Sequence, residues 1–155
     1  MVTPRVRPVG SRITALLERG SAASPTLAVL VDALEDSDVI VHITDCWLID
    51  DAHVGETQFV ATAGRQRYLR IRLDVRLRDE AAIAMLGHEL QHAWEIAAHP
   101  WVSDQKTLHQ LYVQIGYESQ RALRSHAVET TAARDTARDV LNELKTGRRL
   151  LSSTD

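Results

Sequence analysis

Residues 69–98, LRIRLDVRLRDEAAIAMLGHELQHAWEIAA, decide the fold because an alternating pattern passes directly into a helical one. Apolar and polar residues alternate from Leu69 to Arg78, which predicts a half-buried strand. Its inward side chains would be Leu69, Ile71 and Leu73, and its outward ones Arg70, Arg72 and Asp74. From Asp79, the expected N-cap, spacings of three and four predict a helix to about Ala98. The apolar stripe of this helix would consist of Ile83, Leu86, Leu90, Ala93 and Ala97.

The middle of this helix carries the motif His88-Glu89-Leu90-Gln91-His92, an H-E-x-x-H pattern. Residues four apart lie one helical turn apart on the same face, so His88 and His92 can converge on one metal ion. Glu89 is then placed to accept a proton from a metal-bound water. The position of the motif on a helix, with the apolar stripe away from both histidines, supports this interpretation. The structural alternative is a pair of solvent-facing histidines with an unrelated glutamate.

Two helices and two further strands are predicted before this stretch. Residues 1–10 are expected to form a flexible arm, followed by a short helix around residues 13–17 that Gly20 closes. Ser24 is a predicted N-cap with Pro25 at the first helical position, and that helix runs to about Asp36. The β-branched run 39–43 and residues 57–63 are predicted strands, separated by a loop over 45–56, and Gly64 is a turn.

Two more helices are predicted after the motif helix. The first covers about residues 104–115, and the second runs from Ser119 or Ser125 to Leu144 and ends at Gly147, with a frayed tail at 151–155. This order predicts an α+β fold in which a small three-stranded sheet, antiparallel or mixed, packs on the motif helix and the other helices. Residues 11–150 are expected to form one domain, in keeping with a length of 155 residues.

Composition excludes several classes of protein. The single cysteine, Cys46, excludes an internal disulfide and a Cys-rich zinc module. A net charge of −3 argues against a nucleic-acid partner, so we interpret the six arginines between residues 65 and 78 as a solvated outer sheet face. No apolar run reaches the length of a membrane span, and no signal peptide pattern is present. We therefore expect a cytoplasmic protein without a membrane partner; a secreted protein is the alternative if an N-terminal segment has been trimmed.

A catalytic zinc ion needs a third protein ligand. A metzincin would require glycine at position 95 and histidine at position 98, where this chain has Glu95 and Ala98, and His99 is one residue out of register. Glu95 and His99 share the face of the two motif histidines, but one straight helix cannot surround an ion with three side chains. Glu95 is therefore expected beside the ligands or on the cleft wall. Glu129, which is 37 residues after His92 and followed by small residues, is the better candidate.

With HELQH and the later segment ETTAA, the chain resembles the gluzincins, zinc metallopeptidases with H-E-x-x-H on one helix and a glutamate ligand on a later one. It is also similar to small bacterial H-E-x-x-H proteins in which an fET-x-A-A segment follows the motif helix. The chain departs from these patterns at Val128, often aromatic there, and at Ala133, where a Glu-x-x-x-Asp pair would place aspartate. The resemblance implies a zincin-like fold, Zn²⁺ bound by His88, His92 and Glu129, and Glu89 as general base.

The tetrahedral intermediate of such a hydrolysis also needs a hydrogen-bond donor for its oxyanion. His126 lies one turn before Glu129, and Tyr117 or Tyr112 can reach in from the connecting segment, although each of these residue types more often serves packing.

Peptide or protein hydrolysis is the function that this pattern predicts. Two alternatives stay open: a zinc-binding regulatory or interaction domain without turnover, and a zinc amidohydrolase acting on a non-peptide amide. An intact Glu89 disfavours the first, since a purely structural metal has no use for a general base.

Overall fold

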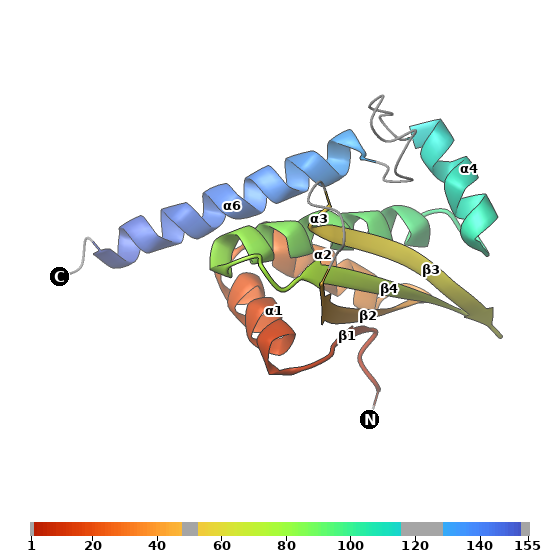
Figure 1. Ribbon diagram of the computed structural model, residues 1–155, viewed down its shortest axis with the longest axis horizontal. Coiled ribbons are helices and arrows are strands. Elements are labelled where there is room, and N and C mark those ends of the chain that lie inside the picture. Colours follow the sequence, from red (N-terminus) through yellow and green to blue (C-terminus); the bar gives the residue numbers. More distant parts are fainter. Residues whose placement is uncertain (1, 48–52, 116–128, 153–155) are drawn as a thin grey trace.

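The computed structural model describes residues 2–47, 53–115 and 129–152. These residues form four strands and five helices, and Figure 1 shows their arrangement. In chain order the elements are β1 (Val6–Pro8), α1 (Ser11–Ala23), α2 (Pro25–Glu35), β2 (Val39–Cys46), β3 (Gly55–Ala63), β4 (Gln66–Asp74), α3 (Asp79–Ala97), α4 (Gln105–Ile115) and α6 (Thr131–Ser152). The predicted α+β class is confirmed. None of the described helices has the length and hydropathy needed to cross a membrane.

The strands form one mixed sheet in the order β1-β2-β4-β3. β1 and β4 run parallel to β2, and β3 runs antiparallel to β4. The mixed sheet is as predicted, but the count of three strands is wrong because part of the expected flexible arm forms β1. The backbone N–H groups of Arg5 and Val6 donate to the Glu35 carboxylate at 2.8 and 3.0 Å. A three-residue strand is too short for periodicity to reveal it.

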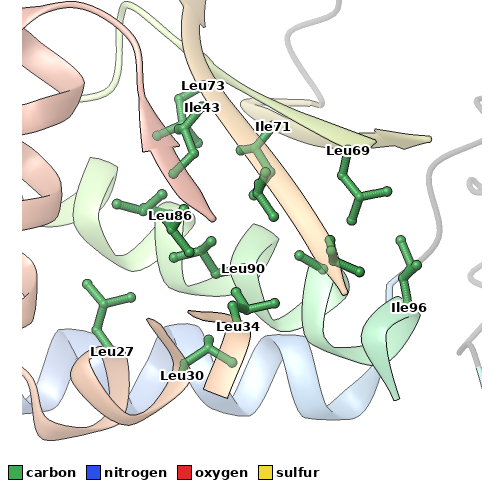
Figure 2. Packing of buried hydrophobic residues seen from close by; sticks show 14 of the residues in the cluster. Leu27, Leu30, Leu34, Ile43, Leu69, Ile71, Leu73, Leu86, Leu90 and Ile96 are labelled. Atoms are coloured by element: carbon green, nitrogen blue, oxygen red, sulfur yellow. The ribbon is translucent and has the colours of Figure 1, made fainter. Parts of the chain in front are cut away.

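The core lies between the sheet and the helices, with α3 packed against strands on one side and α6 on the other (Figure 1). Figure 2 shows leucine and isoleucine side chains of α2, β2, β4 and α3 pointing toward one another. Leu69, Ile71 and Leu73 are fully or almost fully buried, which confirms the inward face predicted for this strand.

The outer face of β4 carries charged side chains that pair across the strands. Arg70 donates to Gln58, and Arg72 forms an ion pair with Glu56, each with the residue directly opposite on β3. This part of the arginine run is the solvated sheet face that the sequence predicted. Asp74, expected to point outward, is instead fully buried and accepts hydrogen bonds from the backbone and side chain of Arg76.

Arg67 is a second exception to the predicted solvated face, because its side chain is buried against the end of α3. Its Nη1 donates to the carbonyl oxygens of Ile96, His99 and Val102 at 2.9–3.0 Å. Its Nε and Nη2 donate to both oxygens of Asp38 at 2.7 Å, and this hydrogen bonding is the main cause that lowers the pKa of Asp38. The guanidinium thus caps the C-terminal end of the motif helix, because the last carbonyl groups of a helix have no hydrogen-bond donor within the helix itself.

The helix starts confirm one capping prediction and correct another. Ser24 caps α2, accepting from the Leu27 N–H at 3.1 Å, with Pro25 first in the helix. Asp79 is not the N-cap of α3: it is the first helical residue, with φ 37°, and Arg78 precedes it without a side-chain cap.

The last helix also differs from its predicted bounds. Glu129 and Thr130 lie before the helix, so the expected continuous helix through this point is wrong; its predicted starts, Ser119 and Ser125, lie outside the described residues. Thr130 caps α6 by accepting from the Ala133 N–H at 3.1 Å. At the other end α6 passes Gly147 and includes residues 151 and 152 of the expected frayed tail.

We predict that Arg67→Met destabilises the protein by about 2–4 kcal/mol, because it removes a buried charged donor from the carbonyl oxygens of Ile96, His99 and Val102 at the end of α3 and leaves Asp38 without its partner. Urea unfolding monitored by circular dichroism measures this. Arg70→Met is the matched control on the exposed face of the same strand and should cost less than about 1 kcal/mol. Equal losses in the two variants would contradict a capping role for Arg67.

Candidate functional site

α3 brings His88 and His92 together, as the motif predicted. Their Nε2 atoms are 3.2 Å apart, and their ring centroids are 4.9 Å apart at an interplanar angle of 77°. Only 8% and 4% of the two residues is exposed, so the alternative of a solvent-facing pair is wrong. α3 is buried on the histidine side as well as along its apolar stripe, because other elements cover both sides.

α6 supplies part of this cover by a close approach to α3. A Cβ atom at Gly87 would lie 3.1 Å from Cγ2 of Val140, so the glycine allows the two helices to pack at this point. Ala133 is fully buried, and the Thr136 hydroxyl donates to Gln91 Oε1 at 3.2 Å. The small residues after Glu129 therefore do permit the close approach that the sequence indicated.

His92 is held by a carboxylate. Its Nδ1 lies 2.9 Å from Oε2 of Glu95, so Nδ1 is assigned as the donor to this carboxylate, and Nε2 faces His88. Burial by itself lowers the pKa of His92, but the hydrogen bond to Glu95 and the charges of Glu89, Glu95 and Glu129 outweigh it and raise the pKa above its ordinary value. Glu95 thus lies beside the histidine pair, as predicted, and its carboxylate contacts the His92 ring.

His88 has the opposite electrostatic environment. Burial, followed by the charges of His92 and Arg134, lowers its pKa to about 4. His88 is therefore a neutral imidazole near pH 7, the form in which histidine binds metals. The site thus pairs a histidine whose pKa is lowered with one whose pKa is raised, and a metal ion would compete with protons more strongly at His92 than at His88.

Glu89 is buried beside the pair and is positioned by β3. The Thr57 hydroxyl donates to Glu89 Oε2 at 2.7 Å. A Cβ atom at Gly55 would lie 2.9 Å from Glu89 Oε1 and 2.8 Å from Cγ of Met85, so glycine is needed where the strand passes the carboxylate. Burial, the largest influence, raises the pKa of Glu89. Sequence reasoning missed Gly55 and Thr57; the only signal was a glycine two residues before a threonine at the start of a strand.

Tyr112 on α4 packs against the histidine pair. Its ring packs edge-on against His92 with centroids 5.5 Å apart. Burial, then the charges of Glu95 and Glu89, raise the pKa of Tyr112 well above 10, so its hydroxyl keeps its proton. Of the three oxyanion donors considered from sequence, Tyr112 is brought to the site, whereas Tyr117 and His126 lie outside the described residues.

Glu129 lies near the site, but in the part of the chain that the structure describes no hydrogen bond or ion pair joins it to either histidine. Its side chain is 53% exposed, and its Oε2 lies 4.0 Å from Nε of Arg134. Its charge is nevertheless among those that raise the pKa of His92. Within residues 2–47, 53–115 and 129–152, no group of three or more His, Cys, Asp and Glu side chains is already arranged to hold a metal ion.

His99 does not belong to this arrangement. Its Nδ1 bonds to the Glu95 backbone carbonyl at 2.6 Å, and its ring packs against Trp101. The described site is therefore a pair of converging imidazole nitrogens with an adjacent buried carboxylate, a donor set suited to a first-row divalent metal and proton transfer.

Comparisons of this chain with models of protein families, with curated proteins and with solved structures gave no match.

We predict that Glu89→Gln stabilises the metal-free protein at pH 8 but not at pH 4. Because the native pKa of Glu89 lies above the unfolded value of about 4.3, folding favours its protonated form, and its ionisation lowers stability as the pH rises. Glutamine removes that cost. Urea unfolding with a chelator present, at both pH values, measures the difference.

The control for this experiment is Glu18→Gln on the exposed side of α1, which should show no gain that grows with pH. A gain for Glu89→Gln of the same size at pH 4 and pH 8 would mean that ionisation of the buried carboxylate does not limit stability.

Proposed function

We propose that this chain is a small zinc-dependent metallopeptidase, with His88, His92 and Glu129 as metal ligands and Glu89 as general base. The observation that carries the proposal is the convergence of the two buried Nε2 atoms at 3.2 Å beside a buried glutamate. A purely structural pair of histidines would gain nothing from a neighbouring carboxylate that is buried at a cost in solvation.

The donor chemistry fits zinc. Imidazole nitrogen and carboxylate oxygen are common zinc ligands, and zinc-bound histidines usually donate their other N–H to a carboxylate or carbonyl group. His92 has such a partner in Glu95. Glu129 supplies the third donor in this proposal, from the residue before the N-cap of α6 rather than from α3.

In the proposed hydrolysis each residue of the site has a different role. A zinc ion bound here supplies Lewis acidity and lowers the pKa of a water molecule. Thr57 fixes Oε2 of Glu89, so we assign Oε1 as the atom that accepts the proton of the attacking water. Burial raises the pKa of this carboxylate, and a raised pKa makes a carboxylate a stronger base. Tyr112 keeps its proton and its ring packs against His92, so we assign its hydroxyl as a donor to a developing oxyanion; His126 and Tyr117 stay predictions for the same role.

A peptide is the substrate class that this arrangement favours. β3 lies at the edge of the sheet and passes Glu89 at Gly55 and Thr57. An extended peptide can pair with the backbone of an edge strand, which would bring a peptide bond alongside the carboxylate.

We predict that the purified protein binds close to one zinc ion per chain and that Glu129→Ala weakens this binding by orders of magnitude, since a carboxylate ligand is lost. Metal analysis and competition with a chromophoric chelator measure both. Asp139→Ala, which removes a surface carboxylate further along α6, is the control and should bind zinc like the parent. Unchanged affinity in Glu129→Ala would exclude Glu129 as a ligand.

We further predict that Glu89→Gln retains zinc while hydrolysis of a denatured protein or peptide library falls by at least about 10²-fold, because the proton acceptor is gone. Mass spectrometry of the products measures cleavage. Loss of zinc and activity together would indicate a ligand or structural role for Glu89. Zinc binding without any hydrolysis in the parent would favour a regulatory domain, and cleavage of non-peptide amides alone would favour an amidohydrolase.

A further inference from the structure

Glu95 also links α3 to the residue that begins α6. Its two carboxylate oxygens have different partners: Oε2 lies 2.9 Å from His92 Nδ1, and Oε1 accepts from the Thr130 hydroxyl at 2.5 Å. All three side chains are buried. A buried carboxylate that is hydrogen-bonded on both oxygens cannot rotate without losing a bond, so it fixes both partners relative to each other.

The Thr130 hydroxyl is used in two directions. It donates its proton to Glu95 and accepts from the Ala133 N–H at 3.1 Å as the N-cap of α6. The position of this one oxygen therefore sets both the start of the helix and its placement against α3.

Glu129 is the residue immediately before Thr130, and adjacent Cα atoms are separated by a fixed distance of about 3.8 Å. Fixing Thr130 against Glu95 thus also fixes where the backbone of Glu129 stands relative to His92. We propose that Glu95 and Thr130 form a positioning pair that orients the His92 ring and holds Glu129 beside it. The expected effect on zinc affinity rests on the proposed function. The expected effect on the orientation of the His92 ring does not.

The neighbouring contact between the same helices provides a matched comparison. The Thr136 side chain is buried, and its hydroxyl donates to Gln91 Oε1 at 3.2 Å rather than to a partner of a motif histidine. If Thr130 served only to join α3 and α6, replacing Thr136 would have a similar effect on the site.

The test uses four variants of the full chain. Thr130→Val removes the donor and the cap, whereas Thr130→Asp keeps an acceptor for the Ala133 N–H but has no proton for Glu95. Thr130→Ser keeps both functions, and Thr136→Val is the control. Nitrogen-15 NMR of the metal-free protein reports the tautomer and hydrogen bonding of His92, and chelator competition measures zinc affinity.

We expect Thr130→Val and Thr130→Asp to shift the His92 Nδ1 resonance and to weaken zinc binding by about 10- to 100-fold. Thr130→Ser and Thr136→Val should stay within about threefold of the parent, with the parent His92 spectrum. Equal effects of Thr130→Val and Thr136→Val would overturn the proposal, as would an unchanged His92 spectrum in Thr130→Asp. If the parent binds no zinc, the proposed function fails, and the metal-free spectra still decide whether Thr130 positions His92.

Discussion

The Arg67 guanidinium is the interaction on which the placement of the motif helix depends. It extends from β4 and donates to carbonyl oxygens at the end of α3, while Asp38, just before β2, holds its other edge. One buried cation thereby joins two neighbouring strands to the negative end of the helix dipole. Because α3 carries both histidines and Glu89, this contact sets where they stand relative to the sheet and to β3.

Each element packed around α3 contacts a different side chain of the candidate site. β3 supplies Thr57 to Glu89, α4 supplies the ring of Tyr112, and the start of α6 supplies Thr130 to Glu95. The two histidines, one turn apart, have pKa values shifted in opposite directions: burial lowers the pKa of His88, whereas the hydrogen-bonded Glu95 carboxylate raises that of His92. A motif shared by many sequences acquires its individual chemistry from these contacts.

Sequence reasoning succeeded where the signal is local. Ser24-Pro25 specifies a helix start through one side chain and one ring, and the alternation around Leu69 and Ile71 specifies which face of β4 is buried. It failed where a distant partner decides. β1 forms because it pairs with β2 and because Glu35 accepts a hydrogen bond from its backbone. Arg67 is buried because it donates to carbonyl oxygens at the end of α3. No window of neighbouring residues contains those partners.

The sequence by itself determined that His88 and His92 share one helical face next to Glu89, because the spacing of a helix requires it. It also indicated that the small residues after Glu129 let a later helix approach closely. Only the tertiary structure decided that this face is enclosed, that Gly55 and Thr57 pass Glu89, and that Glu95 connects His92 to Thr130. The physical reason is that periodicity fixes directions within one element, whereas burial and hydrogen bonding at the site arise between elements far apart in the chain.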